Sequence, residues 1–470
     1  MTMPLSFRPA PRCFPLILLA ALAPLQLLAA DFSWNNGVDF QSYTTPANWI
    51  MTGVDEGAAG YPDGLDNIIS PTQLGALNVP SLGASFNNLN FDRSGDAAGE
   101  SWQLVSLGSG LLSINGAINK AGTTSLSFRS GNGTRLNVAV NALNITAGGV
   151  SFGTNNSSQA LGSLSVGNTS VTNGSMSVTV GPSTTATVDT PSVYTVGALT
   201  VETAGIVNLR SSSGASVAQV QTLSGTASNA IVRASSTNAA CIAVLQLVGS
   251  ASTSYAGTLV NGGTGTSLRV EKTGTGIQTL SGVNTFTGGL KVTGGTLRLG
   301  AANALTGATG DIEVNGGTLD SNVSASTLGG ALILSSGGVS ANGASTGTFS
   351  LASGKNLTIS GGALTLQLGT QFDQLTSLGG SAAFSITGGT FVLDISGAGF
   401  NYGNTYSVLN GFSGSNTVNN LAFTGYDTSN YTASLSNTGV LSFAAVPEPG
   451  GAAMGLIGLG ILLLRKRARR

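Results

Sequence analysis

Short segments in which apolar and polar residues alternate fill most of this chain. In residues 296–299, Leu297 and Leu299 point to one side while Thr296 and Arg298 point to the other. This two-residue period is typical of a half-buried β-strand. Between residues 31 and 446 no long segment carries the 3.6-residue period of an amphipathic helix. The pattern therefore predicts an all-β protein.

One phrase recurs between these strands: an apolar residue, a small residue, Gly-Gly, a small residue and another apolar residue. It occurs at 292–297, 314–319, 359–364 and 386–391, with shorter relatives at 114–116 and 145–150. A constant turn phrase at periods of about 20 to 50 residues indicates a solenoid. At about 20 to 25 residues per turn, roughly 17 to 20 turns are expected. We therefore predict a right-handed parallel β-helix. An array of β-sandwiches is the alternative, because a Gly-Gly turn can also close a hairpin.

The segment 268–300 resembles the autotransporter-associated β-strand repeat. The positions that carry the resemblance are Lys272, Gly274, Gly276, Leu280, Gly282, Asn284, Thr285, Phe286, Gly288, Gly289, Val292, Gly294, Gly295, Leu297, Leu299 and Gly300. Weaker resemblances occur at 86–92 and at 372–375 and 402–409, near the start and the end of the segment 31–446, which we call the body. The resemblance implies a rod of the kind found in autotransporter passengers.

Both ends of the chain resemble targeting signals. At the N-terminus, two arginines precede the apolar run 14–30, and Ala30 precedes Asp31. This is the arrangement of a secretory signal peptide that is cut between Ala30 and Asp31. At the other end an apolar run, 450–464, is followed by a basic tail. This run is short for a hydrocarbon core about 30 Å thick, and the basic tail would keep its end in the cytoplasm.

A short polar motif precedes this apolar run. The motif and the first basic residues of the tail are Val446, Pro447, Glu448, Pro449, Arg465, Lys466 and Arg467. Their order resembles the PEP-CTERM sorting signal. That resemblance implies export by the Sec machinery, a transient anchor in the inner membrane, and processing by an exosortase-type membrane protease. It places the protein at the cell surface or in the extracellular matrix of a Gram-negative-type bacterium, with exopolysaccharide as a partner.

Removing the two signals changes the charge of the protein. The whole chain has 18 basic and 19 acidic residues, but residues 31–446 hold 11 basic and 18 acidic ones. Charged residues make up only 8% of the chain, compared with about a quarter in ordinary soluble proteins. The exported body is therefore mildly acidic and poor in charge. Nucleic acid is not an expected partner, because its binding requires clustered Lys and Arg.

The sequence offers little catalytic chemistry. It contains no histidine, which excludes a Ser-His-Asp triad, a Cys-His pair and a His-ligated metal. The acidic residues concentrate between 63 and 100 and read as turns, and the Gly-Gly phrases lack the aspartates of a calcium-binding repeat. We predict no catalytic residues, cofactor or metal.

Six asparagines precede Ser or Thr with one residue between, which is the triplet of a glycosylation site. We expect them to lie in solvated loops or inward asparagine ladders and not to carry sugars (Asn132, Asn144, Asn155, Asn156, Asn168 and Asn173). Few tyrosines are available to stack against a sugar ring: Tyr194, Tyr255, Tyr402, Tyr406, Tyr426 and Tyr431.

These observations predict a signal peptide, a solenoid body and a sorting tail. The expected segments are the signal peptide (1–30), an N-terminal cap with the first turns (31–120), an irregular solenoid (121–265), a solenoid with the repeat (266–410), last strands and linker (411–445), and a sorting signal with a transmembrane helix (446–470). The expected function is structural or adhesive and not enzymatic. The alternatives are a polysaccharide lyase or hydrolase on a parallel β-helix, and a passive carrier of glycosylation.

Overall fold

The computed structural model describes residues 31–34, 49–52, 67–69, 76–79, 84–92, 101–106, 110–131, 135–153, 161–179, 192–210, 215–235, 241–343 and 345–447. The predicted signal peptide and nearly all of the predicted sorting signal lie outside these residues. Among the described residues, no helix is long and apolar enough to cross a membrane.

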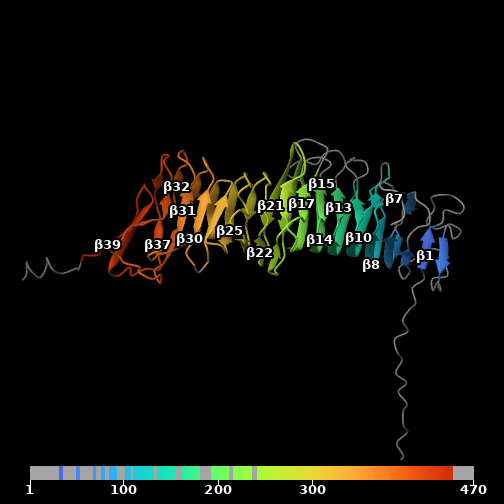
Figure 1. Ribbon diagram of the computed structural model, residues 1–470, viewed down its shortest axis with the longest axis horizontal. Coiled ribbons are helices and arrows are strands. Elements are labelled where there is room, and N and C mark those ends of the chain that lie inside the picture. The colour runs from blue at the N-terminus through green and yellow to red at the C-terminus, as the bar shows by residue number, and fades with distance from the viewer. Residues whose placement is uncertain are drawn as a thin grey trace, which may run out of the picture.

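The described residues form a rod of stacked β-strands whose colour runs from blue to red along its axis (Figure 1). Successive turns of the chain pair in parallel, and together they build a long sheet of 24 strands. A second sheet of eight strands lies on the other side of the earlier turns, and a third sheet of four strands lies on the other side of the later turns. The predicted parallel β-solenoid is confirmed, and the β-sandwich alternative is wrong because neighbouring strands come from successive turns and not from hairpins. The right-handed sense stays a prediction.

The long sheet contains β1 (Asp31–Trp34), β2 (Trp49–Thr52), β3 (Asn67–Ile69), β5 (Ala84–Phe86), β6 (Asn88–Asp92), β8 (Leu111–Ala121), β10 (Asn137–Ile145), β12 (Ser163–Val171), β14 (Ser192–Val201), β16 (Ala215–Ser224), β18 (Cys241–Leu247), β19 (Thr253–Tyr255), β21 (Thr266–Lys272), β22 (Ile277–Leu280), β23 (Leu290–Val292), β24 (Thr296–Leu299), β25 (Ile312–Ser321), β27 (Leu332–Ser340), β29 (Leu357–Ile359), β30 (Ala363–Gln367), β32 (Phe384–Ile386), β33 (Thr390–Asp394), β36 (Thr417–Val418) and β37 (Ala422–Thr424). The second sheet contains β4 (Ala76–Val79), β7 (Ser101–Ser106), β9 (Ser125–Arg129), β11 (Gly148–Phe152), β13 (Gly174–Thr179), β15 (Ile206–Arg210), β17 (Ile231–Ala234) and β20 (Thr258–Asn261). The third sheet contains β26 (Ala325–Leu328), β28 (Thr348–Leu351), β31 (Gln374–Ser377) and β35 (Leu409–Asn410). A small terminal sheet contains β34 (Tyr406–Ser407), β38 (Tyr431–Leu435) and β39 (Val440–Ala445).

The repeated Gly-Gly phrases stack directly on one another. Val292 pairs with Val314, and Leu297 pairs with Leu319 on the far side of the turn. The two later phrases pair in the same way. The repeat in the sequence is therefore a repeat in space, as the period predicted.

The turns are longer than expected in much of the rod. Stacked residues are 22 positions apart at Arg298 and Asp320, but 30 at Ser165 and Thr195 and 32 at Phe384 and Asn416. Most turns give one strand to the second or third sheet, which hold eight and four strands in the described residues, and the turns that contain β21 to β24 give none. The number of described turns is accordingly well below the 17 to 20 expected. The estimate failed because it extended the shortest spacing to the whole chain.

Glycine is required where the corners of consecutive turns meet. Gly295 has φ of 55°, a left-handed conformation that favours glycine. A Cβ atom at this position would lie 2.4 Å from the backbone oxygens of Gly274 and Gly276 in the turn below. The absence of a side chain therefore permits the close stacking of the two corners.

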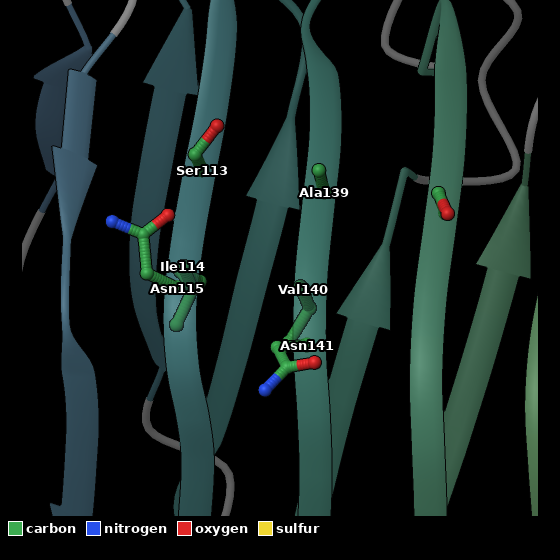
Figure 2. A pocket seen from close by; sticks show the side chains of 7 residues that line it. Ser113, Ile114, Asn115, Ala139, Val140 and Asn141 are labelled. Atoms are coloured by element: carbon green, nitrogen blue, oxygen red, sulfur yellow. The ribbon is translucent and has the colours of Figure 1, made fainter.

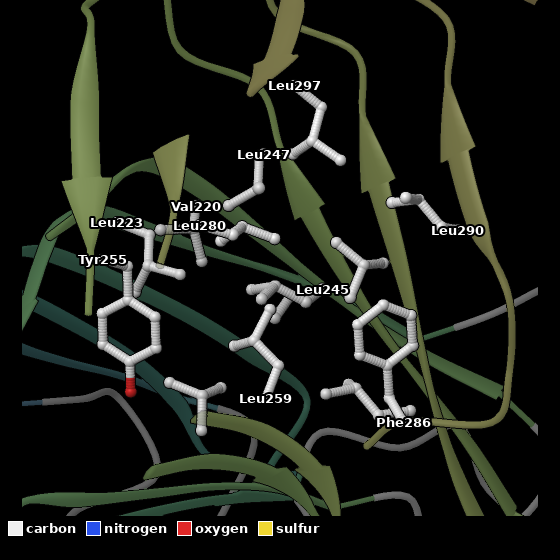
Figure 3. Packing of buried hydrophobic residues seen from close by; sticks show 14 of the residues in the cluster. Val220, Leu223, Leu245, Leu247, Tyr255, Leu259, Leu280, Phe286, Leu290 and Leu297 are labelled. Carbon is white, nitrogen blue, oxygen red and sulfur yellow. The ribbon is translucent and has the colours of Figure 1, made fainter. Parts of the chain in front are cut away.

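The inward residues form one continuous apolar column. In β24 the residues alternate between partly exposed and buried, which leaves Leu297 and Leu299 with no exposed surface. Figure 3 shows this part of the column, where Leu245, Leu259 and Phe286 pack near Leu297 from different strands and loops. Each turn is too small to bury its own apolar face, so its neighbours supply the rest of the core.

Antiparallel strands occur only at the two ends of the described rod. At the first end β1 pairs antiparallel with β2, and at the other end β39 pairs antiparallel with β34 and β38. The last turns also carry an aromatic cluster, in which the rings of Tyr402 and Tyr431 stack at 3.8 Å and Phe443 meets Tyr402 edge-on at 5.2 Å. Such ends cover the open edges that would otherwise pair with another chain.

Asn284 joins three turns from inside the repeat. Its side chain has no exposed surface. The oxygen accepts the backbone N–H of Leu259 at 2.7 Å, and the amide donates to the backbone oxygens of Gly282 at 2.9 Å and Ala304 at 2.8 Å. The backbone groups around it need both an acceptor and a donor, so an apolar side chain or a carboxylate at this position would lose some of these hydrogen bonds.

We therefore expect Asn284→Ala to lower the free energy of unfolding by about 3 kcal/mol or more, because it removes three hydrogen bonds to backbone groups. Urea denaturation followed by far-UV circular dichroism measures this loss. The control is Asn303→Ala, an exposed asparagine, which should change stability by less than about 0.5 kcal/mol. Equal effects of the two substitutions would contradict the role assigned to Asn284.

Candidate functional site

The outer face of the long sheet carries a ladder of polar side chains. Thr195 donates to Ser165 at 3.2 Å, and Gln219 donates to Gln246 at 3.0 Å, which in turn donates to Glu271 at 3.1 Å. Register pairing places these residues in one row across consecutive turns. Most of this row is uncharged, so it offers hydroxyl and amide groups to a ligand.

Asparagines form a second ladder on the same sheet. Asn119 donates to Asn90 at 2.7 Å, and Asn144 donates to Asn119 at 2.8 Å, all at exposed positions. The expectation that Asn144 lies in a loop or an inward ladder is therefore wrong. It lies outward on β10, because the inward positions beside it, Leu143 and Ile145, are apolar. Asn132, Asn155 and Asn156 lie outside the described residues.

A shallow hollow of about 330 Å³ interrupts this polar face. It lies across β8, β10 and β12, where the pairing of β8 with β10 shifts register between Val140 and Ala142. Figure 2 shows Asn115 and Asn141 on neighbouring strands beside the small residues Ser113 and Ala139. The hollow is lined by polar and apolar groups without charge, and nothing in its lining points to catalysis.

Charged residues concentrate on the long sheet at the repeat. Arg269 meets Glu271 at 3.3 Å, and Lys291 meets Glu313 at 3.9 Å. Arg269 and Glu313 also line a hollow of about 210 Å³ together with Asp311. Both ion pairs are partly exposed, and such pairs contribute little to stability. Charged residues from successive turns therefore lie together on one face.

Two carboxylates near the end of the rod have environments that differ strongly. Asp373 has no exposed surface, and burial raises its pKa to about 6 despite hydrogen bonds from the backbone of Gln367 and Gly347. The nearby Asp394 also raises it. Hydrogen bonds from the side chain and backbone of Ser396 lower the pKa of Asp394. Opposite shifts in a pair of acids are typical of glycosidases, where one acid is protonated and the other ionised.

The geometry gives Asp373 a structural task. One of its oxygens accepts the N–H of Gly347 at 2.6 Å, and the other accepts the N–H of Gln367 at 2.8 Å. Both oxygens are thereby engaged with backbone, and the side chain does not reach the surface. The sequence suggested only that 372–375 belongs to the closing turns, and the hydrogen bonds show Asp373 tying two loops together.

The raised pKa of Asp373 predicts a pH-dependent stability. The folded protein holds the proton of the Asp373 carboxyl more tightly than the unfolded chain does. The stabilisation that this protonated carboxyl contributes is therefore fully present below pH about 4 and is lost as pH rises through about 6. Relative to Asp373→Asn, the native protein should lose about 2 to 3 kcal/mol of stability from about pH 4 to pH 7. Thermal melting across this range measures the difference.

Asp394→Asn serves as the matched comparison. Because the pKa of Asp394 is lowered in the folded protein, its contribution is present above its ordinary pKa and is lost as pH falls. The two substitutions should therefore change the pH profile in opposite directions. A profile that neither substitution alters would contradict the assignment.

The sequence-predicted site residues are only partly described. Val446 and Pro447 follow β39, where Val446 is exposed and donates its N–H to the oxygen of Asn430 at 2.8 Å. Asp31 is the first residue of β1. Ala30, Glu448, Pro449, Arg465, Lys466 and Arg467 lie outside the described residues. The sorting and cleavage assignments stay predictions.

The tyrosines do not form a sugar-binding platform on the described sheets. Tyr194, Tyr255 and Tyr406 are buried, and Tyr402 and Tyr431 pack against each other in the terminal cluster. Within the described residues, no group of three or more His, Cys, Asp and Glu side chains could hold a metal ion.

Comparison with known protein families finds one repeat in the chain. Residues 270–299 match the family described as Passenger-associated-transport-repeat, which confirms the passenger-type repeat predicted at 268–300. No curated protein matches the chain. The match and the parallel solenoid together support an autotransporter-passenger-like β-helix, and they fit an exported surface protein.

Proposed function

We propose that this protein is a non-enzymatic structural or adhesive rod of the cell surface or the exopolysaccharide matrix. The observation that carries the proposal is the outer face of the long sheet, where hydrogen-bonded Ser, Thr, Asn and Gln side chains link two or three successive turns at several places. Such a face makes many weak polar contacts with a hydrated polymer. No cofactor is needed for this function.

The sorting step of the proposal rests on the sequence. Sec export would remove residues 1–30, the tail 446–470 would hold the protein briefly in the inner membrane, and an exosortase-type protease would release it toward the surface. The motif Val446-Pro447-Glu448-Pro449 and the basic residues Arg465, Lys466 and Arg467 carry this part.

Deleting residues 446–470 should remove the protein from the surface of intact cells, because the signal that delivers it is gone. Labelling of intact cells with an antibody against the body, and intact mass of the extracellular form, measure the two consequences. The native protein should start at Asp31 and lack Arg470. Equal surface labelling with and without the tail, or a surface form that retains Arg470, would contradict the sorting step.

A polysaccharide hydrolase or lyase is the second candidate, because a parallel β-helix is compatible with either function and Asp394, unlike the buried Asp373, is partly exposed. Reducing-sugar and unsaturated-product assays on a panel of polysaccharides, with and without calcium, separate the two functions. The structural proposal predicts no turnover. Turnover that Asp394→Asn abolishes would replace it with the enzymatic candidate.

A further inference from the structure

The second sheet differs in charge from the rest of the body. Its described strands contain no Asp, Glu or Lys, and their only charged residues are Arg129, Arg210 and Arg233. The long sheet, by contrast, carries both acids and lysines in its described strands. A mildly acidic rod therefore has one side whose described strands bear only positive charge.

The three arginines lie on the outer surface of this sheet. Each follows an inward, buried residue in its strand, and each is itself partly exposed. Arg129 and Arg210 lie three strands apart, on β9 and β15, with β11 and β13 between them. At about 4.8 Å per strand this separation is roughly 14 Å. Arg233 lies on β17, the next strand after Arg210.

A polar network holds the guanidinium of Arg233 in place. Its Nε donates to the side-chain oxygen of Asn208 at 2.7 Å, and the amide of Asn208 donates to the hydroxyl of Ser177 at 3.0 Å. Asn208 is two residues before Arg210 in β15, so their side chains leave the same face of the sheet. The network thereby fixes Arg233 beside Arg210 and leaves its terminal nitrogens for a ligand.

The positive charge of this pair is not neutralised within the described part of the chain. Burial and the neighbouring Arg233 lower the pKa of Arg210, in that order. The Nε atoms of Arg129 and Arg210 are buried and have no hydrogen-bond partner among the described residues. Two like charges side by side, with unpaired buried donors, are unfavourable unless an anion joins them.

A row of uncharged polar residues runs beside the arginines. Register pairing aligns Gln103, Ser127, Ser151 and Ser177, and then continues through Asn208 to Arg233. Hydroxyl and amide groups spaced by one strand suit the hydroxyls of a sugar chain. Aromatic platforms for stacked bases do not occur in this row, so the face favours a polysaccharide over a nucleic acid.

We propose that the outer face of the second sheet binds an acidic polysaccharide, with Arg210 and Arg233 clamping one carboxylate or sulfate group. Guanidinium groups bind both anions through paired hydrogen bonds. Arg129 meets a second anionic group further along the polymer, while Ser127 and Ser151, which are partly exposed, contact sugar hydroxyls. This inference rests on the proposed matrix function and adds to it that the polymer is acidic and that it binds the outer face of the second sheet.

Binding of the purified body, residues 31–446, tests the site. The probes are alginate, which carries carboxylates, dextran sulfate, and neutral dextran of equal length. Arg210→Gln with Arg233→Gln should weaken binding of at least one acidic polymer by about tenfold or more, because charge-assisted hydrogen bonds are lost. Neutral dextran should bind weakly and equally to both proteins. The preferred acidic polymer identifies the anion.

The matched control is Arg298→Gln with Lys355→Gln, which removes the same charge from outside the second sheet. It should change affinity less than about twofold. Arg210→Lys with Arg233→Lys keeps the charge and should bind between the native and glutamine forms, since lysine lacks the planar pair of donors. This variant also serves if the glutamine form does not fold, as judged by circular dichroism.

Three results would overturn the site: no binding of either acidic polymer by the native protein, equal losses in the glutamine and control variants, or equal binding of neutral dextran. Surface labelling of cells that carry the glutamine variant separates this inference from the proposed function. The variant should reach the surface normally, because sorting depends on the tail. If the glutamine variant reaches the surface normally and still binds the polymer, only the proposed binding site is wrong. Delivery to the surface is tested separately by the tail deletion.

Discussion

The stacking of one turn directly on the next is the constraint on which the whole structure depends. Parallel pairing fixes the distance between turns at about 4.8 Å, so residues in equivalent positions of successive turns must tolerate each other at that spacing. Inside, this condition selects apolar side chains that form one column. At the corners it selects glycine, since a side chain at Gly295 would collide with the backbone of the turn below. On the outside it converts single polar residues into hydrogen-bonded rows.

The same constraint explains how a protein with so few charges can offer distinct surfaces. Each row of outward side chains is built from one residue per turn, so each row has its own chemistry. The long sheet presents asparagine and hydroxyl ladders and then a band of ion pairs at the repeat. The described strands of the second sheet present arginines beside serines. A long rod can therefore contact a polymer differently on its different sides.

The sequence predicted the part of the fold that repeats. The alternation around Leu297 and the Gly-Gly phrases identified strands, turns and a solenoid, because these features depend on local chemistry that recurs at short intervals. The length of the turns was less well predicted, because the intervals grow where the phrase is absent. The link from Asp373 to Gly347 spans 26 positions and follows no repeated phrase, so only the register of the turns reveals it. The arginine face was missed for the same reason: 129, 210 and 233 are unevenly spaced in the chain and meet only through the order of the strands.

The register of neighbouring turns can be measured by a disulfide across the outer face. Ser165 and Thr195 are register partners whose hydroxyls lie 3.2 Å apart, and strand partners at about 4.8 Å are within reach of a disulfide. In a body in which Cys241 is replaced by Ala, Ser165→Cys with Thr195→Cys should form an intramolecular disulfide on mild oxidation, detected by mass spectrometry of the monomer. The off-register pair Ser165→Cys with Val193→Cys should not. A disulfide in the off-register pair and none in the matched pair would contradict the stacked solenoid.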